Sequence, residues 1–219
     1  MKEKIILIAI EGWSENGAEW NYSLLREELK SLPIKIVVPS YLDAKGKFSR
    51  FRSHRTVEEY ASKVEKVILA ERRENPNAKI YVLGHSLGGV IARYLCSKNF
   101  LPEEYMILAG TPNLGINFGF LKNSILKILA KICNVPAFFQ LLEGSKFIYT
   151  LNIFGIPSKA HYIFGEEDSV VSRASSDPLK IGISVPNCGH KLFPREKEKL
   201  ESSAIPVIKR ILEKGLENK

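Results

Sequence analysis

Ser86 lies at the centre of a Gly-x-Ser-x-Gly sequence, residues 84–88, between two segments with different hydrophobic patterns. Residues 79–83 form a short apolar run after a turn signal and predict a buried strand, whereas residues 87–96 repeat apolar side chains at helical spacing. A strand that turns directly into a helix strains its central residue and exposes that residue's side chain. We therefore expect Ser86 to be a nucleophile, with the Leu87 backbone N–H aimed at negative charge forming beside it. The alternative is an ordinary glycine-rich turn.

A serine hydroxyl is a poor nucleophile at neutral pH, so it needs a base within hydrogen-bond reach. The chain has four histidines. His85 cannot reach round to Ser86, His161 begins a predicted strand at the opposite edge of the sheet, and His54 lies far upstream. His190 follows the last predicted strand in a turn-forming loop. We predict that His190 is the base, and the alternative is a solvent-exposed loop histidine.

An acid is needed to orient that base, and Asp168 follows the penultimate predicted strand. Its neighbours Glu166 and Glu167 are competing carboxylates, and Asp177 is a more distant one. A structural role for Asp168 as a helix N-cap is the alternative to a catalytic one. We predict that Asp168 is the acid.

The remaining elements alternate between strand and helix patterns. Strands are expected at 4–10, 34–38, 79–83, 104–109, 160–165 and 181–185, and helices at 20–32, 57–68, 87–96 and about 203–216. This alternation predicts a three-layer α/β/α sandwich around a mostly parallel sheet of about six strands. Sites in such sheets form at the carboxyl ends of the strands. We expect one domain over residues 1–219, with a helical cap insertion at about 116–154.

Composition places the chain among ordinary globular proteins, because 45% of its 219 residues are hydrophobic and 26% are charged. No apolar run reaches the length of a membrane span. The run Ile5 to Ile10 is too short for a signal peptide, and it lacks a small-residue cleavage site, so we expect a cytoplasmic protein. The widely spaced Cys96, Cys133 and Cys188 predict free thiols rather than a disulfide framework or a metal site.

The chain order Ser86, Asp168, His190 resembles that of the α/β-hydrolase superfamily, and in particular its small lipase and esterase members. The resemblance extends from the first strand to the last helix. It rests on five segments: the elbow at 84–94, the loop at 109–115, the cap-closing segment at 142–152, the acid loop at 165–171 and the base loop at 189–190.

This resemblance implies an oxyanion hole made by the backbone N–H groups of Leu87 and Trp13. Relatives usually have His-Gly in the loop after the first strand, where this chain has Glu11-Gly12. The N–H donor does not depend on that side chain, but a carboxylate near the hole would disfavour anionic acyl groups. The alternative is that Glu11 turns to solvent or pairs with a lysine.

The resemblance also implies a function: a serine esterase or lipase that cleaves carboxylic esters through an acyl-enzyme on Ser86, without metal or cofactor. The same site would suit a thioester, an amide or an acyl acceptor other than water. A non-catalytic binding protein of this fold is a further alternative, because fold alone does not determine function.

The insertion at 116–154 is very apolar and is expected to line an acyl pocket for an ester or lipid substrate. The side chains proposed to bind substrate are Phe118, Phe120, Leu121, Phe138 and Phe139. Its lysines at 122, 127 and 131 would also suit peripheral contact with an anionic lipid interface. The alternative is a buried core helix whose lysines are solvated.

The net charge is +8, and several cations are concentrated in residues 43–55 together with Phe48 and Phe51. We interpret this segment as a solvated loop, with attraction of anionic substrates as the alternative. No nucleic-acid-binding motif accompanies it, so no nucleic-acid partner is expected. The sequence does not indicate an oligomeric state.

Overall fold

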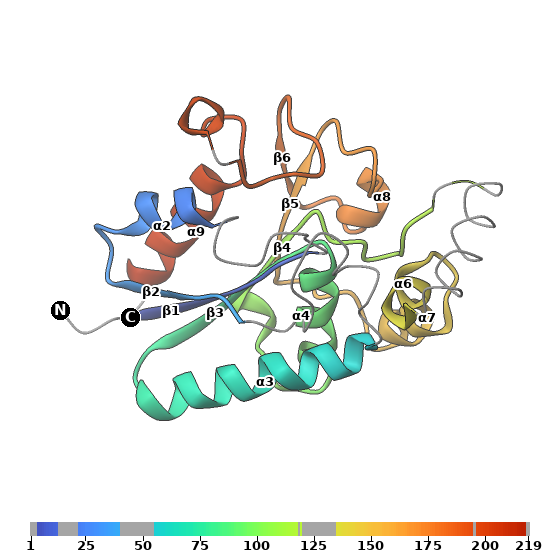
Figure 1. Cartoon of the computed structure of the whole chain (residues 1–219), viewed down its shortest axis with the longest axis horizontal. Helices are drawn as coiled ribbons and strands as arrows, with labels where there is room; N and C mark the ends of the chain where they lie inside the picture. Colours follow the sequence, from blue (N-terminus) through green and yellow to red (C-terminus); the bar gives the residue numbers. More distant parts are fainter. Residues whose placement is uncertain are drawn as a thin grey trace.

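Six parallel strands form one sheet in the computed structural model, with the order β2-β1-β3-β4-β5-β6 (Figure 1). The structure describes residues 4–12, 22–39, 55–117, 119, 135–194 and 196–217. The strands are β1 (Ile5–Ile10), β2 (Ile34–Val37), β3 (Lys79–His85), β4 (Met106–Ala109), β5 (His161–Gly165) and β6 (Ile183–Val185). The predicted parallel α/β sheet is therefore confirmed.

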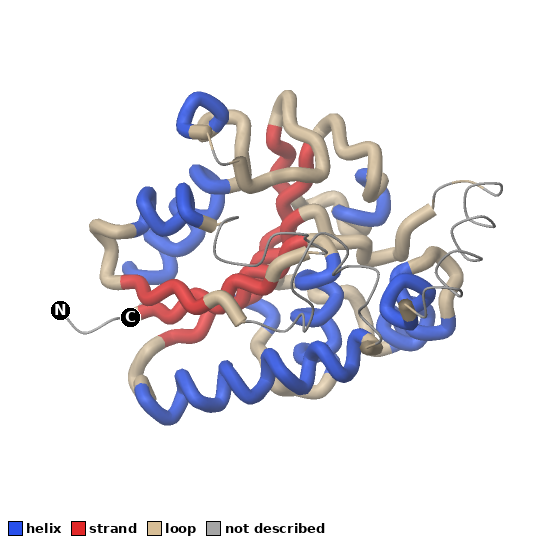
Figure 2. The backbone as a smooth tube through the Cα atoms, viewed as in Figure 1, coloured by secondary structure: helices blue, strands red, loops and turns tan. Residues whose placement is uncertain are grey.

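Helices cover both faces of the sheet, which lies between them in Figure 2. The helices α3 (Val57–Glu74), α4 (Leu87–Ser97), α6 (Pro136–Leu141) and α7 (Lys146–Ile153) contribute to one hydrophobic core. The helices α2 (Ser23–Leu29) and α9 (Ile205–Glu217) contribute to the other. The short α8 (Arg173–Ser176) follows β5, and single 3-10 turns occur at Glu103–Tyr105 and Lys197–Lys199.

The sheet separates these two cores, and strand β1, between β2 and β3, contributes side chains to both. All six of its side chains are fully buried, which explains its unbroken apolar sequence. Because successive side chains of a strand point to opposite faces, Ile6 and Ile8 enter the core beneath α3 and α4, whereas Ile5 and Leu7 enter the core beneath α2 and α9.

Local chemistry explains where several elements begin. Thr56 and Glu59 form a capping box at the start of α3: the Thr56 hydroxyl accepts from the Glu59 N–H, and the Glu59 carboxylate accepts from the Thr56 N–H at 2.7 Å. The strand predicted at 104–109 begins only at Met106, because a 3-10 turn from Glu103 to Tyr105 precedes it. The strand predicted at 181–185 begins at Ile183.

The cap insertion is described only in part, because residue 118 and residues 120–134 lie outside the described residues. Its described part is attached to the body at two points. Ile116 pairs with the end of α6, donating its N–H to Leu141 and accepting from Glu143. Gln140 accepts from the Val57 N–H at 2.7 Å and donates to Glu58 at 2.6 Å, which joins α6 to the start of α3. The division of the chain into one domain and a cap stays a prediction.

Other predicted features also lie partly outside the described residues. Apart from Arg55, the basic segment at 43–55 lies outside the described residues, as do Cys133 and the cap lysines. Cys96 and Cys188 are free thiols, as predicted. None of the helices in the described ranges is long and apolar enough to cross a membrane.

Candidate active site

Ser86 occupies the turn between β3 and α4 with a backbone conformation that L-residues rarely adopt, at φ 52° and ψ −118°. Its backbone N–H donates to Ala109 on the neighbouring strand β4 at 2.9 Å, which helps to hold the turn in place. The N–H of Leu87, the first residue of α4, has no acceptor within the helix. The turn predicted from the sequence is therefore present, and strain is concentrated at its serine.

Two glycines allow this turn to pack closely. A Cβ atom on Gly84 would lie 2.5 Å from the backbone of Gly89, and a Cβ atom on Gly88 would collide with the carbonyl oxygen of Ile10. The start of α4 thus packs directly against the end of β1. Side chains at either position would push the helix away from the sheet.

Ser86, His190 and Asp168 form one hydrogen-bonded chain. His190 Nε2 lies 3.0 Å from Ser86 Oγ, and His190 Nδ1 lies 2.8 Å from Asp168 Oδ2. The Asp168 side chain is only 3% exposed, whereas the His190 ring is 19% exposed and can be reached from solvent. The structure therefore brings together the three residues predicted from the sequence, although Ser86 and His190 are 104 positions apart in the chain.

Asp168 is not a helix N-cap, because the next helix, α8, begins at Arg173 and is capped by Ser172, but its side chain also holds the turn that follows β5. Its Oδ1 accepts hydrogen bonds from the N–H groups of Val170 at 2.8 Å and Val171 at 2.9 Å. Burial raises the pKa of this carboxyl, but the hydrogen bonds from His190 and these two amides outweigh that effect and hold its pKa below the usual value. Asp168 is therefore ionised at neutral pH, as a partner of an imidazolium must be.

The competing carboxylates lie elsewhere. Glu166 and Glu167 are exposed at the surface. Asp177 is buried, and its Oδ1 accepts from the Ile181 N–H at 3.0 Å. That bond belongs to the loop before β6 and gives Asp177 a structural task.

His85 has a position that the sequence did not predict. Its Nε2 lies 2.9 Å from the backbone oxygen of His190, so this nitrogen must carry the proton and donate it. Its ring packs against the rings of His190, with centroids 5.2 Å apart, and Phe193, at 5.5 Å. Burial lowers the pKa of His85 to about 4, helped by the nearby His190, so the ring is neutral at physiological pH. His85 thus holds the backbone of the loop that presents His190.

The loop after β1 passes directly beside the serine, where the second oxyanion donor is expected. A Cβ atom on Gly12 would lie 2.9 Å from the Cβ of Ser86. Trp13, the expected donor, lies outside the described residues. Glu11 is 2% exposed, so the alternative in which its side chain turns to solvent is wrong. Together with burial, the Glu11 carboxylate raises the pKa of Tyr22, which shows that the two groups are close.

Arg93 connects the helix that follows Ser86 to the end of α7. Its guanidinium is buried, with 1% of the residue exposed. It donates to the Asn113 carbonyl at 2.9 Å, to the Asn152 side chain at 2.9 Å and to the Gly155 carbonyl at 3.3 Å. Burial lowers the pKa of Arg93 to about 10, so the group stays charged at neutral pH.

The amino-terminal part of the chain matches a known protein family. The family described as "Putative serine esterase (DUF676)" matches residues 1–147, which is more than half of the chain. The chain belongs to this family. The match includes the turn that carries Ser86 and ends before Asp168 and His190. No curated protein matches the sequence significantly.

Solved structures agree with the α/β-hydrolase fold of this serine esterase family member. Est1E from Butyrivibrio proteoclasticus is 13% identical with a TM-score of 0.61, and the alignment covers 97% of this chain and 90% of that one. TT1662 from Thermus thermophilus is 16% identical with a TM-score of 0.63, covering 100% and 91%. XC6422 from Xanthomonas campestris, described as a serine hydrolase without a lid, is 15% identical with a TM-score of 0.57, covering 96% and 83%. At these identities the likeness concerns the fold alone.

The residues expected to bind substrate are only partly described in this family member. Phe118, Phe120 and Leu121 lie outside the described residues. Phe138 and Phe139 lie on α6, where both are half-buried and their rings meet edge to face at 6.0 Å. Among the described residues, no group of three or more His, Cys, Asp or Glu side chains is placed to hold a metal ion. A cofactor-free reaction stays a prediction.

Proposed function

We propose that this member of the serine esterase family hydrolyses carboxylic esters through an acyl-enzyme on Ser86. The observation that carries the proposal is the unbroken hydrogen-bonded chain from Ser86 Oγ through both nitrogens of His190 to Asp168 Oδ2, at 3.0 and 2.8 Å. A serine, an imidazole and a buried carboxylate at such distances are what an activated serine nucleophile requires.

Each residue has a definite task in this reaction. His190 Nε2 takes the proton of Ser86 as Oγ attacks the ester carbonyl, and Asp168 stabilises the imidazolium that forms. The Leu87 N–H and a second N–H from the loop after β1, at Trp13, stabilise the oxyanion. His190 then gives its proton to the leaving alcohol. A water molecule, deprotonated by the same ring, releases the acyl group as an acid.

The acyl group is proposed to be uncharged and apolar. The buried Glu11 carboxylate belongs to the loop that passes beside Ser86, so it opposes a second negative charge on the acyl chain. The apolar cap, with Phe138 and Phe139 in its described part, supplies surface for an alkyl chain.

Peripheral contact with a lipid interface belongs to the same proposal. Three apolar side chains at the end of the cap are strongly exposed: Tyr149 at 67%, Ile153 at 66% and Phe154 at 61%. Exposed aromatic and aliphatic groups on a helix and at its end, as on α7 and at Phe154, are typical of interfacial contact. Cosedimentation with anionic vesicles tests this, because Ile153→Ser/Phe154→Ser should weaken binding; equal binding by the wild type and this variant would exclude the patch.

The proposed reaction is tested with a series of p-nitrophenyl esters from acetate to palmitate. Ser86→Ala should lower kcat/KM by about 10³-fold or more, because the nucleophile is lost. Ser97→Ala is the matched control, since Ser97 lies at the other end of α4 and its hydroxyl donates to the Tyr94 carbonyl. Thioester and anilide substrates with the same acyl groups separate esterase from thioesterase and amidase activity. Unchanged turnover in Ser86→Ala would show that Ser86 is not the nucleophile.

A further inference from the structure

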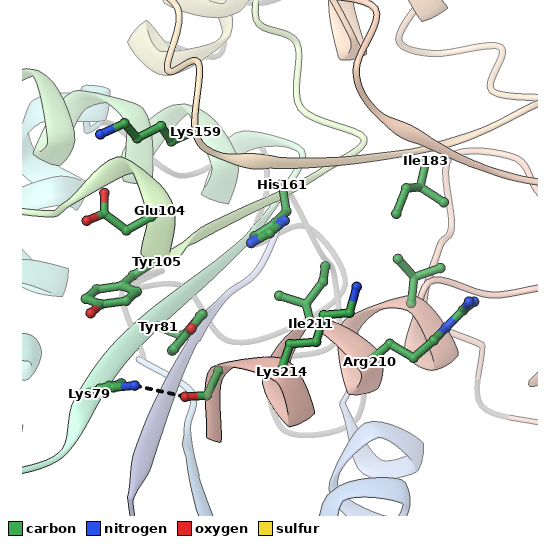
Figure 3. A pocket seen from close by; sticks show the side chains of 12 residues that line it. Lys79, Tyr81, Glu104, Tyr105, Lys159, His161, Ile183, Arg210, Ile211 and Lys214 are labelled. Atoms are coloured by element: carbon green, nitrogen blue, oxygen red, sulfur yellow. Dashed lines mark hydrogen bonds between the residues drawn. The ribbon is translucent and has the colours of Figure 1, made fainter. Parts of the chain in front are cut away.

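A cavity of about 550 Å³ lies far from Ser86, between α9 and the amino-terminal ends of the strands (Figure 3). It is bounded by Lys79 at the start of β3, His161 at the start of β5 and Ile183 at the start of β6. The serine lies after the other end of β3, and a strand of seven residues is about 20 Å long. The cavity is therefore separate from the candidate active site, and its volume suits a small molecule.

The lining of this cavity is strongly basic. It contains four cationic side chains and one carboxylate, Glu104; the cations are Lys79, Lys159, Arg210 and Lys214. Lys79 donates to the Gly215 carbonyl near the end of α9 at 2.9 Å. Within the described part of the chain, none of Lys159, Arg210 and Lys214 is in an ion pair. Several cations gathered around one concave surface favour the binding of an anion.

A neutral imidazole adds a hydrogen-bonding group to this charge. Figure 3 shows the His161 ring pointing into the cavity from β5, and the Lys214 side chain rising into the same cavity from α9. Burial and the charge of Lys214 lower the pKa of His161. A bound anion would accept a hydrogen bond from this ring and neutralise the repulsion from Lys214.

Apolar groups form the rest of the lining. Val207 and Ile211 enter from α9, and Tyr81 and Tyr105 bring their rings together at 5.0 Å. Ile183 of β6 remains 47% exposed at the mouth of the cavity. A small inorganic anion would leave this surface in contact with water, whereas an alkyl chain would cover it.

We propose that the cavity binds an amphiphilic anion, with its carboxylate or phosphate head at Lys214, Arg210 and His161 and a short alkyl chain over Ile183 and Ile211. A fatty acid and an alkyl phosphate share this chemistry, and both suit a cationic site beside an apolar one. The inference does not depend on the proposed ester hydrolysis, because no residue of the cavity touches Ser86, Asp168 or His190.

The test follows the ring protons of His161 by NMR while octyl phosphate or octanoate is added below its micelle-forming concentration. Binding should give a saturable shift of the His161 signals and a higher His161 pKa, since a nearby anion favours the imidazolium. Arg210→Ala/Lys214→Ala should raise Kd at least about tenfold, because two charge-assisted contacts are lost. Lys66→Ala/Arg73→Ala removes the same charge from α3 and should leave Kd within about twofold.

Each result decides one part of the proposal. Tighter binding of octanoate or of octyl phosphate identifies the head group. If inorganic phosphate bound as tightly as octyl phosphate, the alkyl chain would contribute nothing, and the proposal of an amphiphilic ligand would be wrong. A Kd for Arg210→Ala/Lys214→Ala within about twofold of the wild-type value would overturn the assignment of these two cations. If neither amphiphile shifts the His161 signals of the folded wild-type protein, the cavity is not a binding site for this class of ligand.

Discussion

His190 is held by three different groups, and together they position its ring for proton transfer from Ser86. Asp168 holds one ring nitrogen, Ser86 contacts the other, and His85 bonds the backbone carbonyl of His190. The loop that carries His190 is thus fixed at both its side chain and its main chain. A base held in this way loses little orientation before proton transfer, which is how positioning contributes to rate.

Replacing Asp168 should damage catalysis far more than replacing Asp177. Asp168→Asn removes the charge that stabilises the imidazolium and favours the wrong tautomer of His190, so kcat should fall by about 10²–10⁴-fold. Asp177→Asn keeps an oxygen for the Ile181 N–H and should change kcat by less than about threefold. Steady-state kinetics on p-nitrophenyl butyrate compare the two variants. The reverse order of effects would reassign the acid.

His85 is predicted to be a positioning residue. His85→Leu removes the donor to the His190 carbonyl, so kcat should fall about tenfold to a hundredfold while KM changes by less than about twofold. His85→Gln keeps an N–H donor at similar reach and should recover most of kcat. A purely structural role would instead leave kcat per folded molecule unchanged in His85→Leu, and active-site titration with a fluorophosphonate provides the count of folded molecules.

His85 should also make stability depend on pH. Its pKa is about 4 in the folded protein and near 6.5 when unfolded, so the unfolded chain takes up the proton first as pH falls. The contribution to stability is therefore complete above the unfolded pKa and is lost as pH falls toward the folded one. Because part of the ring is exposed, we expect wild type to lose about 1–2 kcal/mol more than His85→Gln between pH 8 and pH 5. Urea unfolding at both pH values measures this, and parallel losses would contradict it.

At the scale of elements, Arg93 joins three segments that are distant in sequence. It extends from α4, the helix that begins at the serine, to Asn113 after β4 and to Asn152 and Gly155 at the end of α7. The end of α7 is thereby fastened to α4, the helix that begins directly after Ser86.

Removing that cation should destabilise the fold. Arg93→Met keeps the length of the side chain but leaves the Asn113 carbonyl and the Asn152 side chain without their donor, so we expect a loss of about 2–4 kcal/mol in the free energy of unfolding. Arg93→Lys should recover only part, because one ammonium cannot reproduce the fork of the guanidinium. Chemical denaturation gives both values. A loss under about 0.5 kcal/mol in Arg93→Met would show that the connection is unimportant.

Hydrophobic periodicity predicted the elements well, except where local hydrogen bonds shift the start of a strand. β1 could be read directly because it is buried on both faces and therefore wholly apolar. The starts of β4 and β6 were misplaced, because Glu103 to Tyr105 form a 3-10 turn and Asp177 captures the Ile181 N–H. Both deviations come from local hydrogen bonds that an apolar pattern does not record.

At the scale of the whole molecule, the parallel arrangement explains why the site could be predicted from so few residues. All parallel strands end at one edge of the sheet, so Ser86 after β3, Asp168 after β5 and His190 after β6 had to converge. The bond between His85 and His190 and the burial of Glu11 could not be predicted. Both depend on how loops return over the sheet edge, which no local pattern determines.

The same arrangement separates two functions that we assign to opposite ends of the sheet. Acyl transfer is proposed at the carboxyl ends of the strands, and binding of an amphiphilic anion at their amino-terminal ends (Figure 3). The two regions share the sheet but no residues. Variants in the basic cavity are therefore expected to leave single-turnover acylation of Ser86 unchanged.

The most direct test of the central claim is covalent labelling of the intact protein by a fluorophosphonate, followed by mass spectrometry of its peptides. The serine activated by His190 should gain one phosphonyl group, located on Ser86, and His190→Ala should react at least about 10²-fold more slowly. Ser86→Ala should show no label on any residue. Labelling of a different residue in the wild type, or equal labelling of Ser86→Ala, would contradict the assignment of Ser86 as the nucleophile.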